Sequence, residues 1–533
     1  MTLAAPLQRI RSEGMSSLAL WVPALVVVGA MLLPAIYLIV RASEGGSDVW
    51  DIVTRASTRD LLARTAWLAL TVTAATIAIA VPAAWLTIRT DLPWRQFWSV
   101  ALALPLVIPS YVGGFVIVAA LGPRGILQDW LEPLGVERLP EIYGFWGAWL
   151  ALTLFTYPYV LLNVQAALRN LDPAIEDASR GLGHGPLSTF FRITLPQLRP
   201  ATVAGGLLVA LYTLSDFGAV SLLRFDSFTR VIYIQYRSSF DRTTAAVLGL
   251  MLVALTIAVL SAEAITRGRA RYHNARATRA AAAPIRLGPW RWPAFAACAF
   301  LALVALGMPL AVILYWLIDG LQAGQSISLV WDAAWNAFRA SGMAALVAVA
   351  ASLPIALLAV RRAGPATALL ERASYLGHAL PGIVVALSLV FFSIRYATPF
   401  YQTLVLLVFA YVVLFLPQAL GSVRASLLQI PSSLEEAGRS LGRGPLRVLT
   451  TITLPLIRPG MWAGAALVFL TAMKELPATL LLSPTGYRTL ATVIWSNTNE
   501  GLFTQASAAA LLLIVIAAAP MALMVILQGR TAR

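Results

Sequence analysis

Three charged residues lie inside long apolar runs, where a charge is costly and therefore marks a candidate functional residue. Asp216 stands in LYTLSDFGAVSLL, and Lys474 and Glu475 stand in FLTAMKELPATLLL. Subtracting 259 places Glu475 on Asp216 and Lys474 on Ser215, so the acidic position is repeated. Two interpretations are open. The residues form an intramembrane pair or capped polar group that fixes two helices, or they line a translocation pathway or gate.

The residue types exclude several kinds of chemistry. Lys474 is the single lysine and Met473 precedes it, so the chain lacks the GxxxxGKS/T phosphate-binding loop of ATPases. The one cysteine, Cys298, excludes an internal disulfide and a cysteine metal cluster. The histidines are too scattered for a zinc site: His184, His273 and His378. We therefore expect no catalytic residues, no metal site and no cofactor in this chain.

The composition is that of an integral membrane protein. Of the 533 residues, 59% are hydrophobic and only 12% charged, against about 25% charged in soluble domains. The net charge of +15 fits arginines that face the cytoplasm and anionic headgroups, so we expect membrane lipids and no nucleic acid as partners. Apolar runs of about 20 residues predict twelve spans. These are 17–40, 64–88, 98–121, 143–167, 201–223, 244–265, 292–318, 340–360, 376–396, 399–420, 461–483 and 504–527.

A 25-residue stretch occurs twice. EDASRGLGHGPLSTFFRITLPQLRP covers 176–200, and EEAGRSLGRGPLRVLTTITLPLIRP covers 435–459, an offset of 259 without a gap. Fourteen of the 25 positions are identical. The chain therefore consists of two homologous halves of six spans each, and we name these stretches the first and second repeat segments. The predicted boundaries are 1–266 for the first half, 267–291 for a basic linker and 292–533 for the second half.

Each repeat segment predicts a helix, a glycine bend and a second short helix. Asp172 is expected to cap the first helix, and Ser432 with Glu435 to form a capping box in the second copy. Glycines follow where a helix ends in the left-handed conformation, at Gly183 and Gly442. A Gly-Pro pair then starts the second helix, which we expect to close at Leu-Pro in each copy.

The distribution of arginine orients the chain. With the N-terminus inside, the inner segments hold 25 of the 39 basic residues, which the positive-inside rule favours. This orientation predicts that both termini, the linker and both repeat segments are cytoplasmic. The first apolar run is too long for a cleaved signal peptide, so we expect it to be a retained span.

The repeat segments resemble the EAA loop of ABC importer permeases. The resemblance rests on an acidic residue and alanine, a glycine six positions later, and a final Ile-x-Leu-Pro. The first copy departs from the pattern at Asp177 and Ser179, and the second at Gly438. Such a resemblance implies an all-α type I permease fold in which each loop docks on a separate cytoplasmic ATPase subunit. The residues that the resemblance assigns to ATPase coupling are Glu176, Asp177, Ala178, Gly183, Ile193, Leu195 and Pro196, with Glu435, Glu436, Ala437, Gly442, Ile452, Leu454 and Pro455.

Within that family, the fused layout with SDFGAV and KELPATLLL is similar to the ferric iron permeases. The resemblance implies a transport subunit rather than an enzyme, with ATP and Mg²⁺ bound by an ATPase homodimer. It also implies a periplasmic binding protein, a bacterial inner membrane location and one chain supplying the whole permease. Permeases for thiamine, putrescine and phosphonate have similar architecture and stay as alternatives. A different class, an ion- or proton-driven secondary transporter with Asp216 and Glu475 as carriers, also has repeats and intramembrane acids.

Overall fold

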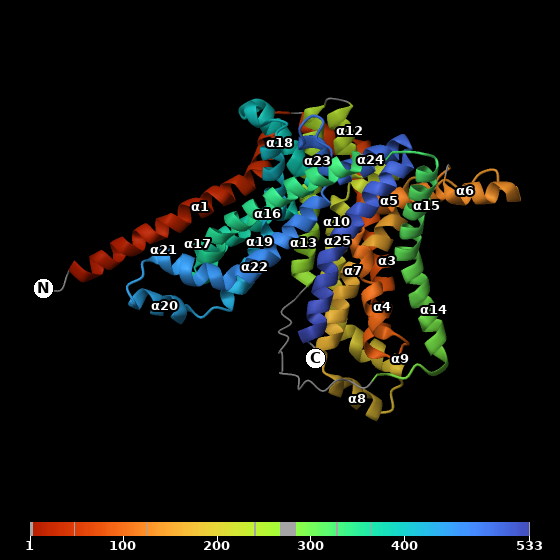
Figure 1. The fold of residues 1–533 in the computed structure, drawn as a ribbon, viewed down its shortest axis with the longest axis horizontal. Coiled ribbons are helices and arrows are strands. Elements are labelled where there is room, and N and C mark those ends of the chain that lie inside the picture. The colour runs from red at the N-terminus through yellow and green to blue at the C-terminus, as the bar shows by residue number, and fades with distance from the viewer. Residues whose placement is uncertain are drawn as a thin grey trace. The chain divides into compact units, whose positions relative to one another are not determined.

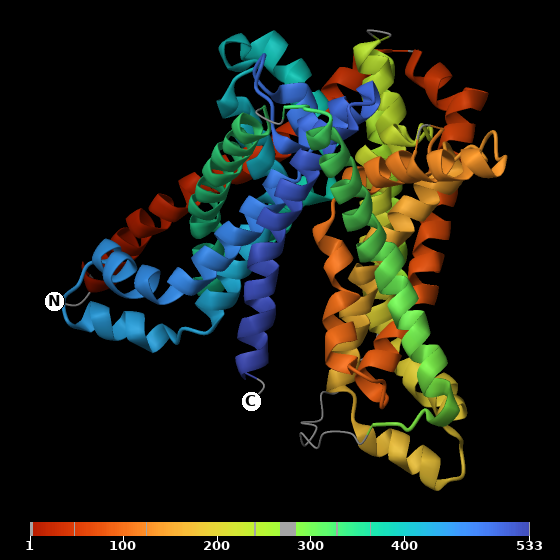
Figure 2. The ribbon, with the colours of Figure 1, turned by 45° about the vertical axis from the view of Figure 1, so that its right-hand side comes forward.

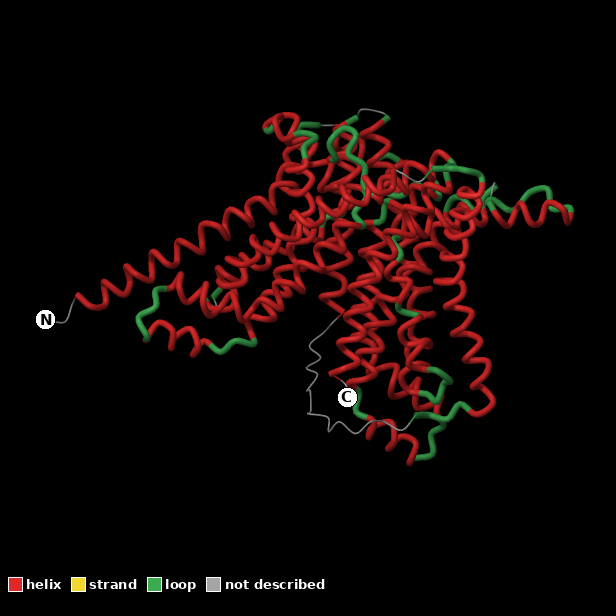
Figure 3. Tube along the Cα trace, in the orientation of Figure 1, coloured by secondary structure: helices red, strands yellow, loops and turns green. Residues whose placement is uncertain are grey.

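The computed structural model describes residues 4–46, 48–123, 125–238, 241–266, 284–326, 329–362 and 364–531. Throughout these ranges the chain is helical and forms no strand, apart from one isolated bridge between Thr90 and Ile285 (Figure 3). The chain divides into two compact units, which are not continuous in sequence. Unit 1 holds Met1–Val49, Asp241–Leu250 and Ser328–Thr492, and unit 2 holds Trp50–Phe240, Met251–Ile327 and Val493–Arg533.

Unit 2 is built on three long helices that pack against one another, α3, α7 and α10. Their bounds are Ala56–Arg89, Phe145–Asn170 and Leu195–Ser215 (Figure 1). The other helices placed wholly in this unit are α4 (Arg95–Ala101), η1 (Leu104–Val107), α5 (Ser110–Leu121), α6 (Ile126–Leu131), η2 (Glu132–Leu134), α8 (Pro173–Gly181), α9 (Pro186–Thr189), η3 (Phe190–Thr194), α11 (Gly218–Leu222), α12 (Phe228–Arg237), η4 (Gly288–Trp290), α14 (Arg291–Ala302), η5 (Leu303–Gly307), α15 (Met308–Gln322) and α25 (Phe503–Thr531).

Unit 1 repeats this core with α16, α19 and α22, which also pack against one another. Their bounds are Leu329–Arg361, Leu404–Leu428 and Leu454–Met473. The other helices placed wholly in this unit are α1 (Ala4–Ser43), α17 (Pro365–Ala379), α18 (Gly382–Tyr396), η6 (Thr398–Phe400), α20 (Ser432–Ser440), α21 (Pro445–Val448), η7 (Leu449–Thr453) and α23 (Pro477–Leu482). Three helices cross the division: α2 (Asp48–Thr54), α13 (Arg242–Thr266) and α24 (Leu490–Glu500).

The first span of each predicted half belongs to the compact unit that holds the core helices of the other half. In unit 1, α1 packs against α16, α17 and α18, as Figures 1 and 2 both show. The Ser388 hydroxyl of α18 donates to the Pro34 carbonyl of α1 at 2.6 Å. In unit 2, α15 packs against α5 and α25, and the Trp316 indole N–H donates to the Ala119 carbonyl at 3.3 Å. Packing and sequence homology therefore divide the chain differently, and the predicted boundaries of the halves stay predictions.

Helices suited to spanning a membrane occupy most of the expected positions. Ten helices in the described part of the chain are long and apolar enough, and a bent pair adds an eleventh. That pair, Pro365–Gly377 and Gly382–Tyr396, turns by 94° where the sequence predicts one span at 376–396. The last expected span, 504–527, falls within α25, which runs from Phe503 to Thr531. Most of the predicted linker, from 267 to 283, lies outside the described residues.

Besides 376–396, three further spans that the sequence predicts as continuous are broken. The predicted span 98–121 is divided into α4, η1 and α5, because Pro105 and Pro109 cannot donate helical hydrogen bonds. The predicted span 201–223 breaks after Ser215 and resumes as α11, and 461–483 breaks after Met473 and resumes as α23. In unit 2 the short helix α11 packs against α5, and in unit 1 the short helix α23 packs against α18.

Candidate functional site

The first repeat segment begins with α8, and its ends agree with the sequence prediction. Asp172 caps α8 and accepts a hydrogen bond from the Ala174 amide at 2.9 Å. Gly183 follows in the left-handed region, with φ +87°. The His184 amide then donates to the Ser179 carbonyl at 3.3 Å, which closes the helix end. The bend is therefore built as expected, and α9 starts at Pro186.

The second repeat segment has the same shape but a different cap. Helix α20 begins at Ser432 after Pro431, without a side-chain cap. The predicted capping box is wrong because the Glu435 carboxylate is turned inward to an arginine of another helix. Gly442 has φ +80°, as predicted for the bend, and α21 starts at Pro445.

Neither short helix closes at Leu-Pro, contrary to the prediction. A wide helical turn, η3 or η7, carries the chain directly into α10 or α22 at Leu195 and Leu454. A turn of this kind accommodates a proline that cannot donate to the preceding turn. Each repeat segment is therefore continuous with a core helix of its unit.

A buried ion pair fixes the first repeat segment to the core of unit 2. Glu176 is 4% exposed, and its Oε1 accepts from the Thr194 hydroxyl at 2.9 Å. The same oxygen lies 3.7 Å from Nη2 of Arg89, the last residue of α3. Arg89 also donates to the Leu171 carbonyl at 3.3 Å, and Arg180 Nη2 lies 3.6 Å from Glu176 Oε2. The carboxylate thus ties α8 to α3 and to the start of α10.

Unit 1 repeats this arrangement in the second repeat segment. Glu435 is 5% exposed, and its Oε1 accepts from the Thr453 hydroxyl at 3.0 Å. Arg361, the last residue of α16, approaches the same oxygen with Nη2 at 3.0 Å and also donates to the Ile430 carbonyl at 3.2 Å. Arg439 Nη2 lies 3.7 Å from Glu435 Oε2. We call these two clusters the first and second anchors.

The anchor arginines were missed in the sequence, although a signal was present. Both are followed four residues later by proline, Arg89 by Pro93 and Arg361 by Pro365. Their separation is 272 residues (361 − 89), not the 259 of the repeat segments, because the loop between the third and fourth spans differs in length. A search for repeats at one fixed offset therefore passes over them.

The structure separates the predicted coupling residues into inward and outward groups. Glu176 and Glu435 are buried in the anchors, whereas their neighbours Asp177 and Glu436 are exposed. Exposed with them are Ala178, Gly183, Ala437 and Gly442, while the half-buried ones are Ile193, Leu195, Pro196, Ile452, Leu454 and Pro455. The resemblance thus groups under one label residues that position the segment and residues that lie on its surface.

A pair of leucines marks the outer face of the repeat segments. Leu182 is 81% exposed and Leu441 is 80% exposed, at matching positions directly before the bend glycines. Ile175 and Leu434, another matched pair, are each 46% exposed. Large apolar side chains held out from an otherwise polar helix are typical of a surface that binds another protein. Sequence reasoning did not single out these residues.

Asp216 lies at the helix break of unit 2, and its carboxylate accepts three hydrogen bonds. Its carboxylate accepts from the Ser110 hydroxyl and from the Ala219 and Val220 amides, at 3.0 and 3.2 Å for the amides. The side chain therefore caps α11 and joins it to the start of α5. This is the capped polar group that the sequence offered as one of its two interpretations.

Glu475 takes the equivalent place in unit 1. Its Oε1 accepts from the Ala478 amide at 3.0 Å, and Gly382, at the start of α18, leaves room for the carboxylate. A Cβ on Gly382 would lie 2.7 Å from that oxygen. Lys474 is half-buried beside it, and no ion pair joins the two among the residues that the structure describes. A place for Asp216, Lys474 and Glu475 in a translocation pathway or gate stays a prediction.

Comparison with known proteins places the chain in a family. The model of the family described as "Binding-protein-dependent transport system inner membrane component" matches it twice, over residues 80–272 and 352–533. The chain belongs to this family. It is an ABC importer permease with two fused halves, an all-α protein that crosses the membrane several times.

The relatives include permeases of two named substrates. "Fe(3+)-transport system permease protein FbpB 2" of Haemophilus influenzae is 36% identical over 95% of this chain and 96% of its own length. "Ferric transport system permease protein FbpB" of Actinobacillus pleuropneumoniae is 26% identical over 76% of this chain and 62% of its own. "Sulfate transport system permease protein CysT" of Escherichia coli is 24% identical over 46% of this chain and 89% of its own.

Proposed function

We propose that this permease couples ATP hydrolysis by a separate cytoplasmic ATPase homodimer to the uptake of ferric iron. In this proposal a periplasmic binding protein delivers the iron, and one chain supplies both halves of the permease in the bacterial inner membrane. Both termini and both repeat segments face the cytoplasm. ATP and Mg²⁺ belong to the ATPase, and iron is the cargo rather than a resident cofactor.

The twin anchored segments carry the proposal of coupling. Each presents an exposed leucine to a partner, and its anchor glutamate is bonded to a threonine at the entry of a core helix. A displacement of α8 is therefore passed through Glu176 and Thr194 to α10, because buried charge-assisted hydrogen bonds resist separation. Helix α10 ends at Ser215, and the carboxylate of the next residue, Asp216, is bonded to Ser110 of α5. Unit 1 repeats the first part of this order, from Glu435 and Thr453 into α22, and Glu475 after α22 faces Gly382 at the start of α18, which supports a motion transmitted by both halves.

The choice of ferric iron rests on the relatives. The ferric permease from Haemophilus influenzae matches almost the whole chain, whereas the sulfate permease from Escherichia coli matches less than half of it at lower identity. Among the described residues no three His, Cys, Asp or Glu side chains gather as a metal site. Cargo handed over by a binding protein needs no tight site in the permease, so this arrangement is compatible with iron.

The coupling proposal is tested by replacing the exposed leucines with glutamate, in L182E, L441E and the double variant. Burying a leucine stabilises a contact by about 2 kcal/mol. Each single variant should therefore weaken ATPase binding about 30-fold, and the double variant should not copurify with the ATPase. L134E is the matched control, because Leu134 is 77% exposed on η2, outside the repeat segments. Normal ATPase copurification by the double variant would refute docking at these leucines.

The substrate is tested separately in proteoliposomes that contain the permease, its ATPase and its binding protein. Iron uptake that requires ATP and the binding protein would support the proposal. Sulfate uptake under the same conditions, without iron uptake, would overturn the substrate while leaving the coupling intact. Uptake that follows a proton gradient without ATP would favour the secondary-transporter class.

A further inference from the structure

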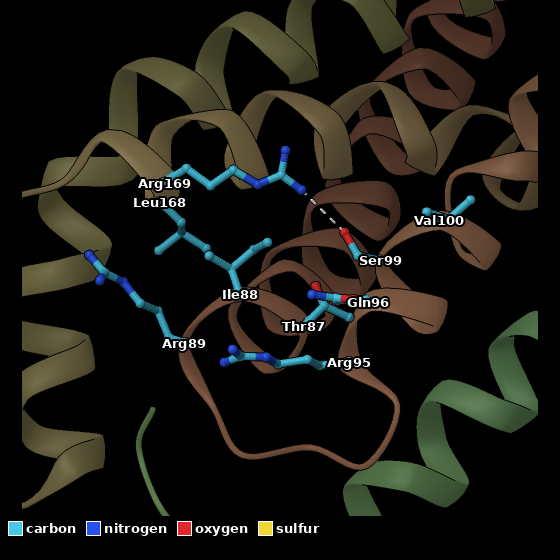
Figure 4. Close-up of a pocket in the computed structure, with 9 residues that line it drawn as sticks. All are labelled: Thr87, Ile88, Arg89, Arg95, Gln96, Ser99, Val100, Leu168 and Arg169. Atoms are coloured by element: carbon cyan, nitrogen blue, oxygen red, sulfur yellow. Dashed lines mark hydrogen bonds between the residues drawn. The ribbon is translucent and has the colours of Figure 1, made fainter. Parts of the chain in front are cut away.

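A basic pocket opens beside the first anchor, within unit 2. It has a volume of about 450 Å³ and is formed by the end of α3, by α4 and by the end of α7. Figure 4 shows three arginines from these helices around it, Arg89, Arg95 and Arg169, together with Gln96 and Ser99. Arg169 donates to the Ser99 hydroxyl at 3.3 Å. None of the residues lining this pocket is acidic.

The arginines of this pocket are only partly compensated. Arg89 is 6% exposed, and its Nε has no hydrogen-bond partner among the described residues, although its Nη2 serves the first anchor. Arg95 and Arg169 are exposed, and in the described ranges neither has an acidic side chain within ion-pair distance. Because two exposed guanidinium groups line the pocket without an acidic partner, it favours a ligand that accepts hydrogen bonds and carries negative charge. Phosphate oxygens meet both requirements.

Aromatic residues set the depth of the pocket in the bilayer. Trp94, directly before α4, is 73% exposed, and Trp290 and Trp292 at the start of α14 are 73% and 68% exposed. Rings of Trp94, Trp98 and Trp292 contact Phe295 of α14, at centroid distances of 5.3 to 6.1 Å. Exposed tryptophans gather where headgroups meet the hydrocarbon core. The exposed tryptophans therefore favour a pocket at headgroup level, where the available phosphate is that of a lipid.

We infer that this pocket binds the phosphate of an anionic phospholipid headgroup, with Arg95 and Arg169 contacting the phosphate oxygens and the buried Arg89 adding positive charge to the pocket wall. The proposed function enters only in assigning the site to the cytoplasmic leaflet. Because Arg89 also holds Glu176, a bound headgroup would stiffen the first anchor.

The second half lacks this site. The offset of 272 that relates the anchor arginines also relates Pro109 to Pro381 (381 − 109), and it places Thr367 on Arg95. The offset of 259 places Leu428 on Arg169. A lipid bound here would therefore act on one half alone, which makes the two coupling segments unequal.

The test measures binding of phosphatidylglycerol to the purified permease alone, without ATPase or cargo, by native mass spectrometry and by the lipid-dependent rise in melting temperature. A basic residue near an anionic surface contributes about fivefold in affinity, so R95Q/R169Q should bind about 30-fold more weakly. R372Q removes one charge from exposed Arg372 of α17, outside the pocket, and should change the affinity less than about twofold. R95K/R169K keeps the charge and should bind within about fivefold of the wild type.

Three results would overturn the inference. The first is equal lipid binding by R95Q/R169Q and wild type. The second is an equal loss of phosphatidylglycerol affinity in R95K/R169K and R95Q/R169Q, together with a lower melting temperature of both variants in phosphatidylcholine. That result would show a purely structural role for the two arginines. The third is a rise in melting temperature with inorganic phosphate alone that R95Q/R169Q abolishes, without any response to phosphatidylglycerol, which would assign the pocket to a soluble anion. Because the ATPase is absent, failure here is distinguishable from failure of the coupling proposal.

Discussion

Replacing Glu435 with alanine should release the second repeat segment from unit 1, whereas replacing its neighbour Glu436 should not. The two glutamates are adjacent in sequence, but only Glu435 is buried and bonded to Arg361 and Thr453. Glu436 is exposed, so its removal leaves the second anchor intact. The prediction therefore separates a positioning role from a surface role within one motif.

The size of the effect follows from what E435A leaves behind. Removing one partner of a fully buried ion pair costs about 3–5 kcal/mol. The Arg361 side chain is 20% exposed and keeps its bonds to the Ile430 carbonyl, so water and backbone compensate part of that loss. We expect a cost of about 2 kcal/mol, which is about a 30-fold rise in the population of the released segment.

Hydrogen exchange on the permease alone measures this population. The amides of Leu441 and Gly442 donate to carbonyls of α20 and report directly on its opening. E435A should speed their exchange about 30-fold, and E436A by less than about twofold. Exchange in E435A within twofold of the wild type, or equal acceleration in both variants, would refute the role of the second anchor. Less ATPase binding by E436A with unchanged exchange would agree with a surface role.

Two further predictions concern the bend and the helix break. G442A should destabilise the bend by about 1 kcal/mol, because φ is +80° at Gly442. G444A is the control and should leave the bend unchanged, because φ is −65° at Gly444 and the added methyl group meets open space at both positions. Hydrogen exchange of the α20 amides measures the difference between the two variants. S110A removes a donor from buried Asp216 and should lower the free energy of unfolding by about 1–3 kcal/mol in denaturant titrations. S341A is its control, since the buried Ser341 hydroxyl has no hydrogen-bond partner among the described residues. An equal loss of unfolding free energy in S110A and S341A would contradict a stabilising bond between Ser110 and Asp216.

Much of the architecture could be predicted because the relevant signals are local. Membrane-length apolar runs identify spans, and the twofold occurrence of one 25-residue stretch identifies the halves. Gly183 and Gly442 were correctly placed in the left-handed region, because a helix that must turn sharply needs a residue without a Cβ. Asp172 was likewise predicted as a cap from its position before Pro173.

The errors arose where tertiary contacts override local preference. A capping box requires the Glu435 side chain to return to its own helix, but Arg361, 74 residues earlier in sequence, holds it instead. The breaks after Ser215 and Met473 were missed because the apolar run continues through them, and only the partners on α5 and α18 show why the helices end. Exposure of Leu182 and Leu441 also depends on which face of α8 and α20 the anchors turn inward.

The packing of α1 has a consequence for how the chain is made. The three helices α16, α17 and α18 that pack against it begin at Leu329, which is 286 positions (329 − 43) after the end of α1. At about 5–20 residues per second, a ribosome needs about 15–60 s to synthesise that interval. Throughout this delay the flank of α1 that later contacts α16, α17 and α18 is covered by lipid, so early insertion and late assembly are separate events for the first helix.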